Sequence, residues 1–176
     1  MHDLPAARFT TYRGGGRVKC AFAPTDAERA AEFFSECVAT GGEAPFVLGG
    51  GSKTVIADGE VSRPVLYTGR MRAVRCVGVR EDGRVLVRAE GGARVSDILA
   101  VCADRGCGGA EFMCGVPATA GGMVRMNAGA FGEETADIVE EAEVSDPLTG
   151  ESRRIRGEDI GFAYRRGAEG FVTAVT

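Results

Sequence analysis

Two glycine-rich segments contain the residues best suited to ligand chemistry, and the first is VLGGGSK at residues 47–53. Three consecutive glycines allow backbone N–H groups to converge on an anion such as a pyrophosphate, because glycine adopts positive φ without steric cost. The spacing is neither GxxxxGK[ST] nor GxGxxG, so a P-loop and a dinucleotide-binding Rossmann turn are both disfavoured. Taken alone, the segment fits an anion-binding nest and a plain hairpin loop equally well.

The second segment reads GVPATAGGMVRMNAGAFGEE over residues 115–134. Pro117 fixes one turn, small residues leave space along the path, and Thr119 and Asn127 offer hydrogen bonds to a phosphate or a heteroaromatic ring. A small-residue crossover packed against a helix is the alternative. So many glycines without a ligand would cost backbone entropy for little gain, and this favours binding.

Bulk properties exclude several classes of function. The 176 residues carry a net charge of −4 without a long Lys/Arg run, which disfavours nucleic-acid and lipid-surface partners. The N-terminus has no apolar signal segment and no window is long enough to cross a bilayer, so we expect a cytoplasmic protein. The six cysteines form no CxxC pair and the single histidine is His2, which predicts reduced structural thiols and no metal site.

Alternating helical and strand patterns predict an α+β protein. Strands are expected at residues 18–23, 45–48, 54–57, 65–67, 72–79, 84–89, 139–145, 151–156 and 171–176. One helix is expected to begin at an N-cap Thr25 with Glu28 as its capping-box partner and to end at Gly41, with Ala27, Ala30, Ala31, Phe34 and Val38 inward. A second helix covers 95–105, and residues 106–132 show no periodicity and are expected to be a ligand-wrapping loop.

The last strand, 171–176, is apolar, and we expect it to lie at a sheet edge with further chain after it. We expect two lobes, 1–68 and 69–176, with a boundary near residues 67–70.

The motifs LGGGSK (48–53), GAEFMCGVPATAGGMVRMNAGAFG (109–132) and FAYR (162–165) together resemble the UDP-N-acetylenolpyruvoylglucosamine reductase (MurB) family of peptidoglycan synthesis. Residues 10–16 also resemble that family's opening threonine and glycine segment. The resemblance covers nearly the whole chain. It implies a fold of the vanillyl-alcohol-oxidase (PCMH) type, in which two α/β lobes with mixed sheets hold FAD between them.

The resemblance assigns most site residues to the cofactor. It implies that Gly49, Gly50, Gly51, Ser52 and Lys53 hold the FAD pyrophosphate. It also implies that the rest of the cofactor is wrapped by Gly115, Val116, Pro117, Ala118, Thr119, Gly121, Gly122, Asn127, Ala128 and Gly129. Related oxidases with covalent flavin often carry a histidine in the first loop, where this chain has Ser52 and Lys53, so a dissociable FAD is expected.

The reaction that the resemblance implies is hydride transfer from NADPH to FAD and then to the enolpyruvyl group of a UDP-sugar, yielding UDP-N-acetylmuramate. Arg165 matches the family's arginine that stabilises charge on the substrate carboxylate. The family's proton-donating serine and its glutamate lie in a C-terminal domain outside these residues, and Arg166-Gly167-Ala168 replaces a serine that the family tends to show. We therefore expect little or no turnover from this chain alone. A catalytically silent flavin-binding module and another FAD oxidase on the same scaffold are the alternatives, and the sequence does not indicate an oligomeric state.

Overall fold

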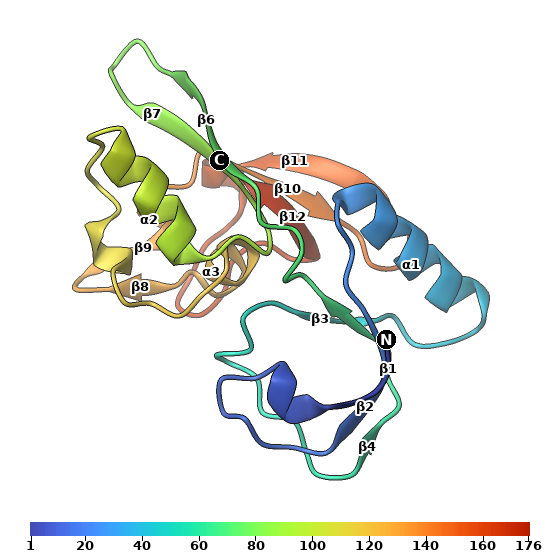
Figure 1. Cartoon of the computed structure of the whole chain (residues 1–176). Coiled ribbons are helices and arrows are strands. Elements are labelled where there is room, and N and C mark those ends of the chain that lie inside the picture. Colours follow the sequence, from blue (N-terminus) through green and yellow to red (C-terminus); the bar gives the residue numbers. More distant parts are fainter.

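The computed structural model describes all residues, 1–176, and contains two five-stranded sheets (Figure 1). The first sheet comes from the N-terminal part of the chain. Its strands are β1 (His2–Pro5), β2 (Arg17–Phe22), β3 (Phe46–Leu48), β4 (Glu60–Val61) and β5 (Val65–Tyr67). Their order is β1-β2-β5-β3 with β4 beside β2, and only the β1–β2 pair is antiparallel. This sheet is therefore mixed.

The second sheet is antiparallel throughout and comes from the remainder of the chain. Its strands are β6 (Val74–Val79), β7 (Val85–Glu90), β10 (Glu141–Ser145), β11 (Ser152–Arg156) and β12 (Phe171–Val175). The order β11-β10-β12-β7-β6 places β12 at the centre, where all five of its residues are buried. The main apolar core lies on this sheet.

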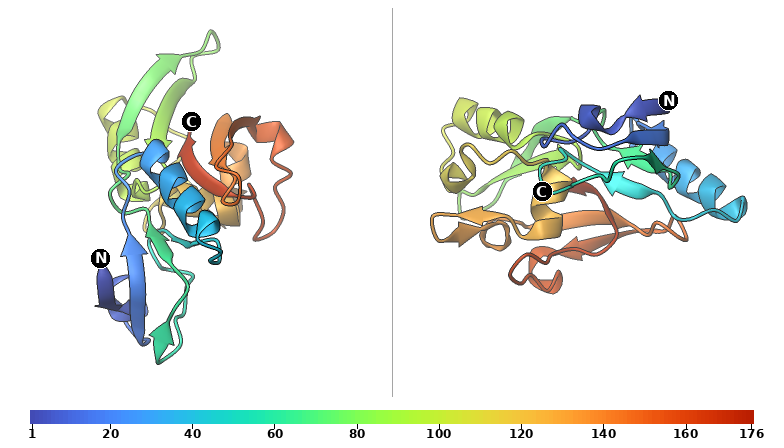
Figure 2. Two further views of the ribbon diagram at one scale, coloured as in Figure 1. Left: turned by 90° about the vertical axis from the view of Figure 1, so that its right-hand side faces the viewer. Right: turned by 90° about the horizontal axis from the view of Figure 1, so that it is seen from below.

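Three helices and a short hairpin complete the fold. They are α1 (Ala27–Ala39), α2 (Val95–Asp104), α3 (Ala120–Met126), and β8 (Gly129–Ala130) paired with β9 (Glu133–Glu134). Short 3-10 turns cover Ala6–Arg8, Glu111–Met113, Thr135–Asp137 and Gly157–Asp159. Figure 2 shows an elongated molecule, with β1, β2 and β4 at one end and the β6–β7 hairpin at the other.

Helix α1 connects the two halves of the molecule. It follows β2 in sequence, yet the ring of Phe34 packs edge-on against Phe171 of β12 with the ring centroids 5.6 Å apart. Leu66 of β5 and Met71 belong to the same buried cluster. The two sheets are thereby held against each other through apolar contacts.

The periodicity located most elements within one or two residues, but the start of α1 was predicted wrongly. The N-cap is Asp26, whose carboxylate accepts the N–H of Arg29 at 2.8 Å, while the Thr25 hydroxyl donates to Asp26. A carboxylate is an equally good cap and carries a charge that favours the positive helix start. Val38, predicted inward, is 38% exposed on the last turn.

Three other expectations also differ from the structure. Residues 54–57 form no strand: the Ala57 carbonyl accepts the N–H of Gly16, and regular pairing with β2 begins only at β4. The predicted loop 106–132 contains helix α3, which Thr119 caps by accepting the N–H of Gly122 at 3.4 Å. Strand β12 is central and not an edge, because β10 and β7 flank it.

Candidate cofactor-binding site

The two glycine-rich segments meet in space. A methyl group on Gly49 would lie 2.6 Å from the Thr119 hydroxyl oxygen, and one on Gly50 would lie 3.7 Å from the Thr119 methyl and 3.8 Å from the Pro117 carbonyl oxygen. Thr119 is buried and begins α3, so the first loop rests on the N-terminal end of that helix. Any side chain at position 49 would have to displace the Thr119 hydroxyl.

The first loop has free hydrogen-bond donors. None of the backbone N–H groups of residues 49–53 donates to an acceptor within the chain. The loop is held instead through its carbonyl oxygens: Gly51 accepts the N–H of Thr11 at 3.2 Å, and Gly50 lies 3.5 Å from the Thr11 hydroxyl. Consecutive unpaired N–H groups form a site for an anion.

A cavity of about 570 Å³ lies where the two segments meet. Its wall consists of Thr11, Gly49, Gly50, Tyr67, Gly69, Arg72, Gly92, Arg94, Val95, Ser96, Leu99, Met113, Cys114, Gly115, Val116, Pro117, Ala118 and Thr119. These residues come from both sheets' connecting loops and from the start of α2. The volume is within the range of small-molecule and cofactor sites, roughly 300–1,000 Å³.

The charges around this cavity are of one sign. Arg72 and Arg94 are the only basic side chains in its wall, and no carboxylate lines it. The whole chain is acidic, with a net charge of −4. Two guanidinium groups beside unpaired backbone donors favour a ligand that carries phosphate.

Gly91 and Gly92 form a third glycine pair, which sequence reasoning did not use. A methyl on Gly92 would lie 1.9 Å from the Thr68 carbonyl oxygen, and one on Gly91 would lie 2.1 Å from that of Val172. Both glycines let the β7–α2 turn pass against other backbone segments, and this turn brings Arg94 to the cavity. In the sequence, the glycine pair between a predicted strand and a predicted helix was the signal that could have indicated Arg94. No such signal indicated Arg72.

Two buried hydroxyls belong to residues that are next in sequence to wall residues of the cavity. Thr10 and Thr68 are buried and their hydroxyl oxygens have no hydrogen-bond partner. Thr68 stands between the wall residues Tyr67 and Gly69, and Thr10 precedes the wall residue Thr11. Buried hydroxyls are normally paired. Neither hydroxyl is part of the cavity wall, and it is the unpaired loop N–H groups and the two arginines that fit a large polar anion such as FAD.

Several of the predicted site residues lie outside this cavity. Gly51, Ser52, Lys53, Gly121, Gly122, Asn127, Ala128 and Gly129 are not part of its wall. A methyl on Gly121 would lie 3.0 Å from the Gly91 carbonyl oxygen, so this glycine lets α3 approach the β7–α2 turn. The Asn127 side chain is used by the protein itself: it accepts the N–H of Ala136 at 3.0 Å and donates to the Ala163 carbonyl at 3.4 Å.

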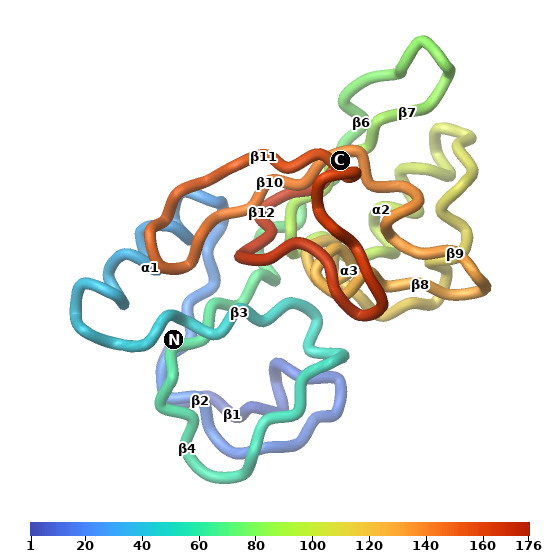
Figure 3. The backbone as a smooth tube through the Cα atoms, turned by 180° about the vertical axis from the view of Figure 1, so that it is seen from behind, coloured from blue at the N-terminus to red at the C-terminus, as the bar shows by residue number.

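Arg165 lies at the other end of α3 from the cavity. It is exposed at φ +57° in a turn closed by reciprocal 2.9 Å hydrogen bonds between Ala163 and Arg166. Gly167 donates to the Arg125 carbonyl, so this loop, red in Figure 3, lies against the C-terminal end of α3. The guanidinium is 5.2 Å from the centre of the exposed Tyr164 ring. The structure therefore does not bring Arg165 to the cavity wall.

Other site types find little support in the geometry. No three histidine, cysteine or acidic side chains gather where they could hold a metal ion. None of the helices combines the length and apolarity needed to span a bilayer.

Comparison with known proteins decides the family. Residues 18–156 match the protein family described as FAD binding domain. The chain belongs to this family. FAD, predicted from the two glycine-rich segments and the resemblance, is thereby confirmed as its cofactor class.

Relatives of this FAD-binding domain carry the name UDP-N-acetylenolpyruvoylglucosamine reductase, which confirms the resemblance. The reductase of Heliobacterium modesticaldum is 37% identical over 166 residues, which are 94% of this chain and 50% of that protein. The reductase of Phenylobacterium zucineum is also 37% identical, over 96% of this chain and 54% of that protein. The chain spans about half the length of these curated relatives.

Solved structures confirm the fold class. The MurB structure from Thermus caldophilus superposes with a TM-score of 0.73 at 27% identity, covering 99% of this chain and 60% of that one. The 6-hydroxy-D-nicotine oxidase of Arthrobacter nicotinovorans gives a TM-score of 0.67 at 18% identity, covering 99% of this chain and 38% of that one. At that identity the likeness concerns the fold alone.

Proposed function

We propose that this chain is the FAD-binding part of a UDP-N-acetylenolpyruvoylglucosamine reductase that acts in the cytoplasm in peptidoglycan synthesis. The single observation that carries the proposal is the contact of Gly49 with Thr119, which joins the two glycine-rich segments around a positively charged cavity. Relatives of that name match over nearly all of the chain. The two lobes divide at residues 1–68 and 69–176, one sheet falling on each side.

The proposed cofactor contacts follow from the wall of the cavity. The unpaired N–H groups of Gly49 and Gly50 would hold the pyrophosphate, and Arg72 and Arg94 would neutralise its charge. Residues 115–119 form the opposite wall. Bound FAD would accept hydride from NADPH and pass it to the enolpyruvyl group of the UDP-sugar, and the chain's own task is to bind and orient it.

Arg165 is the residue that we propose to face the substrate carboxylate. Its turn is tied to α3 through the bond between Asn127 and Ala163, and α3 begins at Thr119 in the cavity wall. Helix α3 therefore links the position of the arginine to that of the cofactor loop. A fixed cation at the carboxylate stabilises the charge that develops there during reduction.

The first test is an absorbance titration of the purified chain with FAD. A flavin spectrum that saturates at one FAD per chain supports the proposal. A chain that stays colourless and takes up no FAD would sink it. Arg94→Gln should weaken binding by about tenfold or more, the usual loss for one charge-assisted hydrogen bond. Arg75→Gln, at an exposed arginine of β6 outside the cavity, is the matched control and should leave the affinity unchanged.

The attachment of the flavin is tested separately. We propose a dissociable FAD, since the only histidine is His2, at the exposed end of β1. Cys114 is exposed and lines the cavity, so it is the side chain to control for. After acid precipitation all flavin should remain in the supernatant for both the wild type and Cys114→Ser. Flavin that pellets with the wild type but not with the variant would show a covalent bond to this thiol.

A catalytically silent flavin-binding module is the second candidate, because the chain spans only half of its relatives' length. NADPH oxidation that depends on UDP-N-acetylglucosamine enolpyruvate separates the two. Turnover by this chain alone would exclude the silent module. We expect this chain alone to bind FAD without turnover. Turnover should appear when the rest of a reductase is supplied.

A further inference from the structure

Two of the six cysteines, Cys102 and Cys107, lie at the C-terminal end of α2. The helix ends at Asp104, and the chain leaves it through Gly106 at φ +64°. Gly106 donates its N–H to the Ala103 carbonyl at 3.0 Å, and Cys107 donates its N–H to the Cys102 carbonyl at 2.9 Å. These two bonds define a Schellman motif, whose first and last side chains frequently contact each other. Both of these contact positions are cysteines here.

The hydrogen bond between the two cysteines limits the separation of their Cα atoms. The shortest path between these atoms runs along the Cα–N bond of Cys107, the 2.9 Å hydrogen bond, and the carbonyl group of Cys102. With standard bond lengths this path adds up to about 6.8 Å, so the Cα atoms are no farther apart than that. Disulfides join Cα atoms that are about 4.4–6.8 Å apart. The backbone is therefore already within the range that a disulfide requires.

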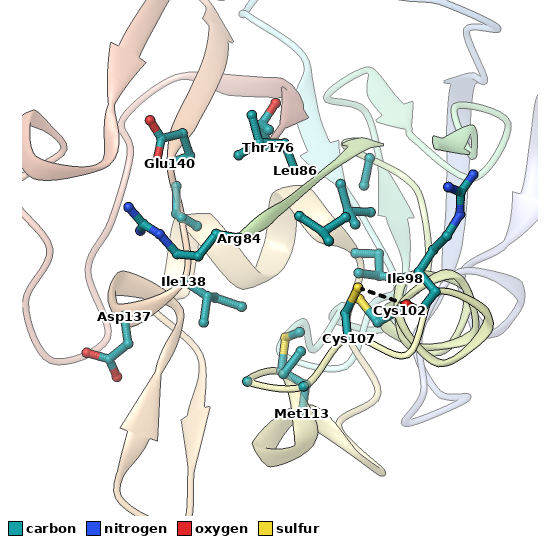
Figure 4. Close-up of a pocket in the computed structure, with 18 of the residues that line it drawn as sticks. Arg84, Leu86, Ile98, Cys102, Cys107, Met113, Asp137, Ile138, Glu140 and Thr176 are labelled. Atoms are coloured by element: carbon teal, nitrogen blue, oxygen red, sulfur yellow. Dashed lines mark hydrogen bonds between the residues drawn. The ribbon is translucent and has the colours of Figure 1, made fainter. Parts of the chain in front are cut away.

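The side chains of the two cysteines are neighbours as well. Figure 4 shows Cys102 and Cys107 turned toward the same hollow, which both residues line. Burial raises the pKa of the Cys102 thiol, and the thiol of Cys107 is the second cause of this shift. The Cys107 thiol donates to the Arg105 carbonyl oxygen at 3.7 Å. All six cysteines of the chain are free, so this pair consists of two reduced thiols.

The two thiols differ in how solvent reaches them. Cys107 lies in an exposed turn, because residues 103–106 and 108–109 on either side of it are exposed. Cys102 packs against the main apolar core from the inner face of α2. The thiolate is the reactive form in thiol–disulfide exchange, and a raised pKa makes it scarcer at Cys102. A reagent in solution therefore meets Cys107 first.

We propose that Cys102 and Cys107 form a dithiol site that low-molecular-weight disulfides, such as oxidised glutathione, convert reversibly into an internal disulfide. Cys107 loses its proton to solvent and attacks one sulfur of the oxidant, which forms a mixed disulfide and releases a thiolate that takes up a proton. Cys102 then loses its proton to solvent and attacks the Cys107 sulfur, and the second thiol leaves. The pair gives up two electrons and two protons, which the oxidant gains as it becomes two thiols.

The site lies outside the wall of the cofactor cavity and does not depend on the proposed function. Its disulfide would close a loop over residues 102–107 at the end of α2. Such a bond stabilises mainly by restricting the unfolded chain, since the backbone of this turn is already in place. Oxidation should therefore raise the Tm by about 5 °C, and dithiothreitol should restore the original Tm.

The test exposes the folded full chain to oxidised glutathione and maps the products by mass spectrometry. Trypsin cleaves after Arg105, between the two cysteines, so the disulfide joins the peptides 95–105 and 106–125. We expect this linked pair together with a loss of about 2 Da from the intact chain, both reversed by dithiothreitol.

Three variants locate the bond. The peptide 106–125 also contains Cys114, so Cys114→Ser is the matched control and should form the same link as the wild type. Cys107→Ser should form no link and show no rise in Tm. Cys102→Ser should stop at the mixed disulfide and keep glutathione on Cys107.

Four outcomes would overturn the proposal. The first is a folded chain that stays fully reduced under these conditions. The second is oxidation that links Cys20 with Cys37, or Cys107 with Cys114, in place of the proposed pair. The third is a link that forms only in urea, which would show that the folded turn keeps the thiols apart. The fourth is a Tm that falls on oxidation, which would show that the turn must distort to form the bond.

Discussion

Replacing Gly49 by alanine probes the contact that joins the two glycine-rich segments. The added methyl would lie 2.6 Å from the Thr119 hydroxyl oxygen, about 0.8 Å inside ordinary contact distance. The cheapest relief is rotation of the Thr119 side chain, which removes the N-cap of α3. Loss of an N-cap lowers the free energy of unfolding by about 1 kcal/mol. Residual crowding brings the total loss for Gly49→Ala to about 1–2 kcal/mol.

A double-mutant cycle isolates this contact. Thr119→Ala alone should cost about 1 kcal/mol through loss of the cap. With Thr119→Ala present, the methyl at position 49 no longer meets an oxygen, and the nearest remaining atom of residue 119 is its Cβ at 3.8 Å. The double variant should therefore be about as stable as Thr119→Ala alone, a coupling of about 1–2 kcal/mol.

The assay is urea and thermal unfolding of the FAD-free chain. For a domain of this size about 1 kcal/mol corresponds to roughly 2–4 °C in Tm. Gly50→Ala is the control, since its methyl would be at least 3.7 Å from any neighbour, and its unfolding free energy should stay within about 0.5 kcal/mol of wild type or rise slightly. Additive effects of Gly49→Ala and Thr119→Ala would refute the proposed contact.

Three more predictions concern stability. Arg88 donates two hydrogen bonds to Glu143 and lowers the pKa of that carboxyl. The pair therefore contributes its full stabilisation above the ordinary carboxyl pKa of 4.5, and this stabilisation is lost as the pH falls through the lower pKa of the folded state. Glu143→Gln should cost about 1 kcal/mol at pH 7, and urea titrations should show the difference vanishing in acid; a constant difference contradicts the pair's role. Thr68→Val removes an unpaired buried hydroxyl and should leave the FAD-free chain equally stable or up to about 1 kcal/mol more so, while a clear loss of stability by the same assay would mean that the hydroxyl has a partner. Asn127→Ala should lower the unfolding free energy by about 2 kcal/mol while one FAD still binds per chain, and unchanged stability with lost FAD binding would instead place this side chain at the cofactor.

Local patterns located most of the secondary structure because periodicity reports which face of an element is buried. The strand β5, the β6–β7 hairpin and helix α2 all appeared as expected. Helix α3 was missed, since its sequence AGGMVRM contains two glycines that lower helix propensity. Tertiary contact at Gly121, against the Gly91 carbonyl, explains why a glycine is used there at all.

The glycine clusters were also visible in the sequence, together with the prediction that they bind an anion. Their joining was not, because the contact between Gly49 and Thr119 depends on how two distant segments pack. The same holds for Arg72, which no local signal distinguishes from other arginines, whereas Arg94 is marked only by the preceding pair Gly91 and Gly92. Only the fold places both beside the free N–H groups of the first loop.

The sequence by itself determined where most of the elements lie and, through the family resemblance, that FAD is the cofactor. Tertiary structure alone decided which of those residues share a cavity, that Asn127 serves the backbone, and that β12 is central in its sheet. The physical reason is that periodicity and turn chemistry are local, whereas the neighbour of a strand and the partner of a loop depend on which distant surfaces bury together.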